Sequence, residues 1–319
     1  MEQRKLIKLG NSSFAIALPK DWIDKSGLKK GDNIFVEQNR NGEITIMSKF
    51  TSINSPKIKE FDFSEKDDLK IQIELLSAYN QDYNIFKIKK TIEKPKIDYA
   101  KNLIKNLLSF EIIEETQDNI TFKDVFNIEE TSIENFIRRM DNIIRSMFED
   151  IKNSIKNKKI TQKQCEEIYK ADKEVTKFHL FIERITMKAL DNPALINMLK
   201  TDSIKLINNR EISSNIEKIG DELKRITKSL RERIDAEELN KILAILDKLN
   251  NLYIMCLTSH YKRDKEKALE IIGAKEIILK ECNKLSEGKS KNLGIIIEKL
   301  KHINSLIFLI IKKIVYTTY

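Results

Sequence analysis

The feature that most constrains the fold is the spacing of apolar residues from about residue 131 onward. Such residues recur at alternating steps of four and three along one run: Ile212, Ile216, Ile219, Leu223, Ile226 and Leu230. This spacing puts every apolar side chain on one face of a helix and is typical of helical bundles. Similar stripes predict further helices over 136–155, 168–185, 239–257, 266–285 and 293–315. Two sets of three similar helices indicate a duplicated three-helix unit.

The composition supports a mostly helical chain. Among 319 residues, 41% are hydrophobic and 34% are charged, and only 8 are Gly and 4 are Pro. Few helix breakers among so many helix formers favour long helices. The net charge of +9 suits an anionic partner such as nucleic acid, but basic residues are spread along the whole chain. Charge alone therefore selects no partner.

Several classes of protein are not expected. The three cysteines, Cys165, Cys256 and Cys282, fit no disulfide or metal-binding spacing, which is typical of a reduced cytosolic protein. The first residues carry no apolar signal segment, and the apolar run 306–311 is far shorter than a membrane span. No catalytic motif is complete, because the Gly288-Lys289-Ser290 run lacks the first glycine of a phosphate-binding loop. We therefore expect a cytoplasmic protein without membrane insertion, and not an enzyme.

The first 50 residues differ from the rest in their frequent turns and alternating apolar residues. Strands are predicted around 4–9 and 14–18, a short helix begins at Pro19 and ends at Gly27, and Asn41-Gly42 marks a second hairpin that pairs Ile34 and Val36 with Ile44 and Ile46. The order is β-β-short α-β-β. So small a unit cannot build an ample core alone, which favours dimerisation.

Residues 51–128 predict a small α/β module. Residues 64–67 are a cap for a helix whose apolar stripe is Leu69, Ile73 and Leu76. A strand at 83–88, a helix at 97–107 and a hairpin over 110–115 and 120–123 follow. The function of this module cannot be inferred from its sequence.

The first region resembles the swapped-hairpin fold of the AbrB/MazE/SpoVT family. The resemblance rests on 4–10, on Leu18-Pro19 with the short helix, and on the Gly27–Asp32 run before a strand. It implies a dimer of interleaved hairpins whose basic residues grip DNA. The DNA-binding candidates on this basis are Arg4, Lys5, Lys8, Asn11 and Ser12.

Two departures from that family weigh against DNA binding. Asn11 stands where its transition-state regulators carry an arginine after the glycine, and Ile23-Asp24 replaces their arginine pair in the helix. The carboxylate of Asp24 would repel phosphate. The alternative is a head that only dimerises.

The helical region resembles PhoU, the phosphate-uptake regulator built of two three-helix repeats. The resemblance rests on the 172–175 run DKEV and the 216–221 run IEKIGD, which are similar to the family's D-x-x-V-D and E-R-I-G-D signatures. Over its whole length the chain resembles archaeal PhoU-type regulators fused to an AbrB-like head. The resemblance implies a regulator of phosphate uptake whose partner is a phosphate ABC transporter ATPase or a sensor kinase.

The PhoU resemblance also implies a metal site, for a divalent cation or iron. Glu217 and Asp221 are four residues apart on one helix face, and Asp172 matches the other signature, although Thr176 replaces its second acid. The alternative is a solvated face on which Asp221 pairs with Arg225.

The second repeat offers a weaker metal site. Ala274 stands where an acid would be expected, and Glu298 is followed four residues later by His302 instead of an aspartate. These two side chains suit a softer metal or no metal.

These observations predict three domains: residues 1–50, a swapped-hairpin domain; 51–128, a small α/β module; and 129–319, a PhoU-like six-helix bundle. The leading hypothesis is a homodimeric regulator of phosphate uptake that binds DNA through its head. The first alternative is a protein-binding regulator of a phosphate transporter whose head only dimerises. The second is a metal sensor or metal-dependent enzyme that uses the acidic helix motifs.

Overall fold

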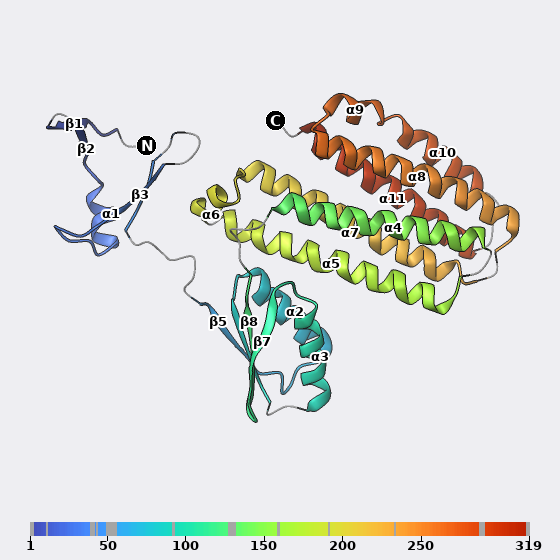
Figure 1. The fold of residues 1–319 in the computed structure, drawn as a ribbon, viewed down its shortest axis with the longest axis horizontal. Helices are drawn as coiled ribbons and strands as arrows, with labels where there is room; N and C mark the ends of the chain where they lie inside the picture. The colour runs from blue at the N-terminus through green and yellow to red at the C-terminus, as the bar shows by residue number, and fades with distance from the viewer. Residues whose placement is uncertain are drawn as a thin grey trace. The chain divides into compact units, whose positions relative to one another are not determined.

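The computed structural model places the chain in two compact units, residues 1–55 and 56–319 (Figure 1). The structure describes residues 3–10, 12–38, 42, 44–48, 56–90, 93–126, 132–157, 160–190, 192–232, 234–286 and 291–316. The second unit contains both the α/β module and the helical bundle, whose buried apolar residues form one continuous core. The boundary at residue 128 stays a prediction.

The first unit, here called the head, consists of two hairpins and a short helix: β1 (Leu6–Leu9), β2 (Ser13–Ile16), α1 (Lys20–Lys25), β3 (Phe35–Gln38) and β4 (Ile44–Met47). Each hairpin is a separate two-stranded antiparallel sheet, in which Leu6 lies opposite Ile16 and Val36 lies opposite Ile46. Gly27 has φ +64°, the left-handed conformation expected after the helix. The predicted order is confirmed, although Ile44 lies opposite Gln38 and Pro19 precedes the helix as its N-cap.

The α/β module is a four-stranded sheet with two helices on one face (Figure 1). Its elements are β5 (Ile58–Phe61), α2 (Asp68–Asn80), β6 (Ile85–Lys89), α3 (Lys94–Lys105), β7 (Phe110–Glu115) and β8 (Asn119–Asp124). The strand order is β5-β6-β8-β7, and only β5 and β6 are parallel, as a helical crossover requires. Aromatic side chains fill the space between the sheet and the helices. The centroid of the Phe86 ring lies 4.5 Å from that of Phe110 and 5.2 Å from that of Phe61.

The predicted apolar stripe of α2 is wrong. The helix buries Ile71, Leu75, Ala78 and Tyr79, whereas Leu69 and Ile73 are exposed. The reason is that this helix carries apolar residues all round, so its spacing does not single out one face. The N-cap is confirmed at Asp67, which accepts a hydrogen bond from the Lys70 amide (2.8 Å). Strand β5 was not predicted.

The described residues of the bundle form six long helices and two short ones. In chain order they are α4 (Ile133–Lys156), α5 (Gln162–Leu190), α6 (Pro193–Met198), α7 (Ser203–Ser229), α8 (Ala236–Lys262), α9 (Lys265–Glu270), α10 (Ala274–Ser286) and α11 (Lys291–Tyr316). Helices α4, α5 and α7 contact one another, as do α8, α10 and α11, and the two sets meet where α7 contacts α11 and α4 contacts α8. This arrangement confirms the predicted bundle of two three-helix units.

The single helix predicted over 266–285 is wrong. It is broken into α9 and α10 by a turn at residues 271–273, where Ala274 donates to the carbonyl of Ile271 (3.2 Å). Gly273 lies in this turn, and glycine is the poorest helix former after proline. No helix in the described part of the chain is long and apolar enough to cross a membrane.

A buried arginine joins the module to the bundle. The side chain of Arg184 on α5 is 2% exposed, and its guanidinium pairs with Asp82 (3.1 Å) and Asp124 (2.9 Å) of the module. It also lies over the ring of Tyr79, 4.6 Å from its centroid. The guanidinium fork can satisfy both carboxylates at once, so this contact fixes the module on α5.

Candidate functional site

The proposed DNA-binding residues lie on or beside the first strand of the head. Arg4, Lys5, Lys8 and Ser12 are exposed, whereas Asn11 lies outside the described residues. Lys8 is opposite Phe14 in the hairpin, so strand alternation puts it on the same face as Leu6 and Ile16. Lys8, the one cation within β1, therefore shares a face with apolar side chains.

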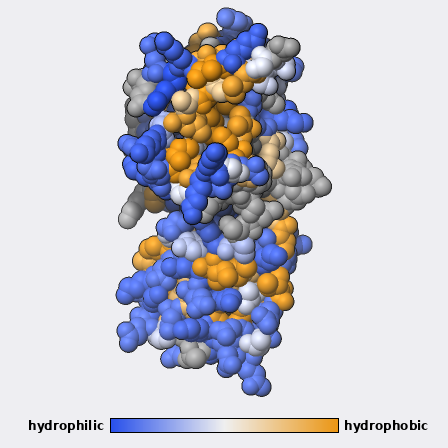
Figure 2. Space-filling view, turned by 90° about the vertical axis from the view of Figure 1, so that its left-hand side faces the viewer, coloured by the Kyte–Doolittle hydropathy of each residue, from blue (hydrophilic) through white to orange (hydrophobic). Residues whose placement is uncertain are grey.

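The head buries nothing by itself: no described residue between 3 and 48 is buried. Nine of its large apolar side chains are 39–67% exposed, and they are here called the head apolar surface: Leu6, Ile7, Leu9, Phe14, Ile16, Ile34, Phe35, Val36 and Ile44. Figure 2 shows apolar residues of the head gathered among hydrophilic ones on the face turned to the viewer. Two isolated hairpins without a core are not stable in water. A surface of this kind marks an interface.

The acidic residues of the first PhoU-like motif come together between α5 and α7. Lys224 Nζ lies 2.5 Å from Asp172 Oδ2 and 2.6 Å from Asp221 Oδ1. Glu217 lies beside them and accepts a hydrogen bond from the Thr176 hydroxyl (3.3 Å). The four charged groups are here called the α5–α7 cluster. The sequence predicted the carboxylates but missed Lys224, although it follows Asp221 by three residues and so shares its face.

Burial and nearby charges raise the pKa values of two carboxylates of this cluster, Asp172 and Glu217. Burial raises the pKa of Asp172 above its usual value, despite the opposing hydrogen bond from Lys224. Burial raises the pKa of Glu217 too, and the nearby charges of Asp221 and Asp172 add to the rise. The cluster thus holds more negative charge than its single lysine balances.

The α5–α7 cluster does not fit a metal ion as it stands. The Lys224 ammonium lies between Asp172 and Asp221, which is where a shared cation would have to sit. Among the described residues, no group of three metal-binding side chains has a suitable arrangement. Arg225 Nη2 is 3.6 Å from Asp221 Oδ2, so the predicted alternative pair forms as well. Metal binding at Asp172, Glu217 and Asp221 stays a prediction.

A glycine lets α7 pack closely against α4. A Cβ atom on Gly220 would lie 3.1 Å from Ile144 Cδ1 on α4 and 3.5 Å from Asp172 Oδ1 on α5. Only a residue without a side chain leaves both neighbours in place. The glycine of the IEKIGD run therefore serves packing.

The second predicted pair, Glu298 and His302, divides between two different partners. Glu298 is mostly exposed and pairs with Lys301 (2.7 Å), whereas His302 Nδ1 lies 3.0 Å from Oε1 of Glu222 on α7. Glu222 is 3% exposed and also pairs with Arg225 (2.9 Å) and Lys299 (3.3 Å). The sequence missed Glu222, the buried carboxylate around which these groups gather. This arrangement is an ion-pair network joining α7 to α11, and metal binding by Glu298 and His302 likewise stays a prediction.

Comparison with protein families gives two matches. Residues 7–52 match the family described as antidote-toxin recognition MazE, bacterial antitoxin, and residues 137–230 match the PhoU domain. A search of curated proteins found no match. The chain thus combines a MazE/AbrB-like head with a PhoU domain, as the resemblances implied. The PhoU match spans α4 to α7, and α8 to α11 lie beyond it.

Both families are regulatory. The fold and the two matches therefore define a chain with a MazE/AbrB-like head and a PhoU-type bundle.

Proposed function

We propose that the chain is a homodimeric regulator of phosphate uptake and phosphate signalling. The observation that supports this most is the combination of a PhoU domain with a head that has no core of its own. The PhoU domain suggests the phosphate response, and the coreless head suggests that two chains must meet. A bundle of this class would bind a phosphate ABC transporter ATPase or a sensor kinase, and such a regulator would act in the cytoplasm.

The head apolar surface supports dimerisation by a second copy. Each hairpin exposes apolar side chains on both faces, because neighbouring residues such as Leu6 and Ile7 are both more than half exposed. Interleaving hairpins of two chains would cover both faces at once and would extend each two-stranded sheet. At about 25 cal/mol per Å² of apolar surface buried, this burial is the main stabilisation available to so small a unit.

DNA contact through Arg4, Lys5 and Lys8 is the second part of the proposal. A dimer presents these three cations twice, and phosphate neutralisation dominates the affinity of such proteins for DNA. The position of Lys8 among apolar residues of β1 favours the alternative, a head that only dimerises and leaves regulation to protein contacts of the bundle. In both forms of the proposal, with or without DNA binding, the chain is a dimer that regulates the response to phosphate.

A gel-shift titration with salt separates the two forms. With DNA from the chain's own promoter region, we expect binding whose affinity falls steeply as salt rises. In the variant Arg4→Ala/Lys5→Ala/Lys8→Ala, the slope of log K against log salt should fall by about 5 per dimer, since each phosphate contact contributes about 0.9. Lys241→Ala, an exposed lysine on α8 paired with Glu237, serves as the control. Absence of binding even at low salt rejects DNA contact and leaves the dimerisation-only regulator.

The phosphate response is tested in cells. Deleting the gene should change phosphate uptake and the expression of the transporter genes when external phosphate is lowered, and the intact gene should restore both. Unchanged uptake and expression in the deletion strain at every phosphate level would reject the proposed function.

A further inference from the structure

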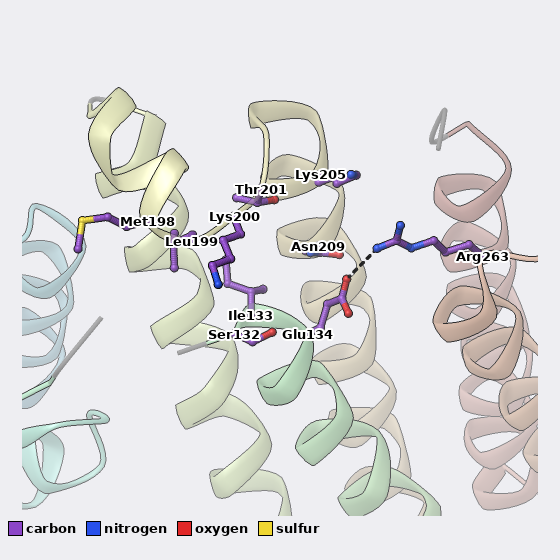
Figure 3. A pocket seen from close by; sticks show the side chains of 10 residues that line it. All are labelled: Ser132, Ile133, Glu134, Met198, Leu199, Lys200, Thr201, Lys205, Asn209 and Arg263. Atoms are coloured by element: carbon purple, nitrogen blue, oxygen red, sulfur yellow. Dashed lines mark ion pairs between the residues drawn. The ribbon is translucent and has the colours of Figure 1, made fainter. Parts of the chain in front are cut away.

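A polar pocket lies at one end of the bundle, away from both PhoU-like motifs. It has a volume of about 440 Å³ and is formed by the start of α4, the turn after α6, the start of α7 and the end of α8 (Figure 3). An adjoining cavity shares four of its lining residues, including Glu134 and Arg263, and adds His260 and Tyr261. The pocket is therefore lined by two segments within the PhoU match, 198–201 and 205–209, and by one segment on either side of that match.

Among the described residues that line this pocket, three side chains are cationic and one is a carboxylate. They are Lys200, Lys205 and Arg263, and the carboxylate belongs to Glu134. The Arg263–Glu134 pair is loose, with Nη2 3.8 Å from Oε1 and both side chains more than half exposed. In Figure 3 these cations come from three different segments, with Asn209 and Thr201 between them. Amide and hydroxyl groups beside several cations are the usual donors for an oxyanion.

The chain holds two of these cations at unusual backbone positions. Lys200 has φ +51° and Arg263 has φ +56°, in turns that follow α6 and α8. After α8 the turn is closed by a hydrogen bond from the Asp264 amide to the Ser259 carbonyl (2.9 Å). Glycine is the usual residue there, and a longer side chain costs about 1 kcal/mol at a left-handed position. Both positions carry a cation in place of glycine, although backbone geometry would favour glycine.

We infer that this pocket binds a phosphate-type oxyanion, either inorganic phosphate or the phosphate chain of a small molecule. Two more cations than carboxylates line it, which disfavours a metal ion or an acidic site. Lys200, Lys205 and Arg263 line the pocket from three segments, and the bidentate fork of Arg263 matches the geometry of a phosphate group. Lys205 also pairs with Asp202 (3.4 Å), so Lys200 and Arg263 are the principal donors in this proposal. The start of α4 adds the positive end of a helix, where the Ser132 side chain makes no cap hydrogen bond.

Binding here would give the proposed regulator a direct sensor, and this physiological meaning rests on the proposed function. The site itself rests on the pocket and its cations. If the chain does not bind phosphate, the results expected for the dimer and for DNA binding stay the same. If instead the chain is monomeric or does not bind DNA, phosphate binding by the pocket is still expected.

Isothermal titration of the full chain at fixed ionic strength tests the inference. Inorganic phosphate, tripolyphosphate and ATP are titrated separately, with sulfate as a control for charge. We expect saturable binding of at least one phosphate ligand, and the ligand that binds most tightly identifies the source. Equal affinity for sulfate, or no saturable binding of any phosphate ligand, overturns the inference.

Variants then locate the site. Lys200→Gln/Arg263→Gln should weaken binding at least about tenfold, because two charge-assisted contacts are lost. Glu134→Gln should tighten binding several-fold, since it removes the carboxylate that competes for Arg263. A misfolded protein cannot bind more tightly, so the second variant separates a binding effect from damage to the fold.

The control is Lys241→Gln, which removes a cation near the other end of α8. Its affinity should equal that of the unaltered chain. An affinity unchanged within about twofold in both pocket variants would overturn the inference.

Discussion

At the scale of single residues, Lys224 serves as the counter-ion of the α5–α7 cluster. Its ammonium lies between two carboxylates on neighbouring helices and neutralises part of their charge. A buried carboxylate such as Asp172 needs a cation, and Lys224 provides one within the chain. The PhoU-like motif thus keeps its acids while their counter-ion comes from the protein.

Removing Lys224 should leave the α5–α7 cluster with uncompensated negative charge. Lys224→Ala should destabilise the fold by about 1–3 kcal/mol, because Asp172 loses a charged partner. The variant should also gain affinity for Mn²⁺, since Asp172 would lose its cation and Asp221 would keep only Arg225, at 3.6 Å. Urea unfolding with and without added Mn²⁺ measures both effects.

Elemental analysis provides the contrasting outcome. We expect the purified chain and its Asp221→Ala variant to have the same metal content. A metal that co-purifies with the chain and is lost from Asp221→Ala would contradict the assignment of Lys224 as the counter-ion.

The raised pKa of Glu217 predicts a pH effect with a defined sign. The folded state binds this proton more tightly than the unfolded state, so the contribution of Glu217 to stability is greatest at low pH and is lost as pH rises through its folded pKa. Glu217→Gln should therefore stabilise the fold at pH 7 by up to about 1 kcal/mol, and by less at pH 5. The glutamine can still accept the Thr176 hydrogen bond.

Urea unfolding at the two pH values measures this effect. Glu174→Gln is the control, since Glu174 lies more than half exposed on α5 with Lys177 as its partner at 3.9 Å. A loss of stability in Glu217→Gln at pH 7 would show that this carboxylate is stabilised in the fold by a cation.

At the scale of elements, close helix contact depends on Gly220. Alanine at an open helical glycine stabilises a helix by up to about 1 kcal/mol. Gly294 on α11 has nothing within 4 Å of an added Cβ, so Gly294→Ala should show that gain. Gly220→Ala should stabilise the fold less than this or destabilise it. Gly220→Leu should destabilise the fold by about 1–3 kcal/mol, because the larger side chain overpacks against Ile144. Equal gains for both alanine variants in thermal unfolding would contradict this role.

The union of module and bundle depends on Arg184. Arg184→Met should destabilise the second unit by about 3–5 kcal/mol, because Asp82 and Asp124 lose a buried partner. Arg210→Met is the matched control, since Arg210 is a more exposed residue on α7 paired with Glu183, and it should cost at most about 1 kcal/mol. Chemical denaturation gives both values, and equal losses would contradict the special role of Arg184.

The elements also show what the sequence could and could not predict. The bundle was predictable because the 212–230 stripe repeats with one period, and every one of its six residues is buried. The buried face of α2 was not predictable, because the helix carries apolar residues on two faces. Leu69 and Ile73 lie on one of them, and Ile71 and Leu75 lie on the other. The break at Gly273 lies within an otherwise helical pattern, and one glycine does not show whether a helix bends or ends.

The sites were predictable only in part, for a similar reason. The spacing of Glu217 and Asp221 shows that they share a helix face, but not which residue from another helix or turn faces them. Arg184, Glu222 and the cations of the pocket take their partners from segments far away in the sequence. Such groupings depend on tertiary packing, which no local pattern encodes.

At the scale of the whole molecule, the two units differ in how they obtain stability. The unit from residue 56 onward has a continuous core of its own, whereas the head exposes its apolar residues. We propose that a second copy of the chain covers these apolar residues and completes the first unit. The homodimer is thus the central claim on which DNA contact and the regulatory role both depend.

Sedimentation equilibrium of the full chain tests this claim most directly. We predict a mass of twice 37.3 kDa for the unaltered chain and of one chain for Phe14→Asp/Val36→Asp, which puts charges into the head apolar surface. Leu69→Asp/Ile73→Asp, which alters exposed apolar residues of α2, should remain dimeric. A monomeric unaltered chain, or a dimer that the head variant leaves intact, would contradict the account.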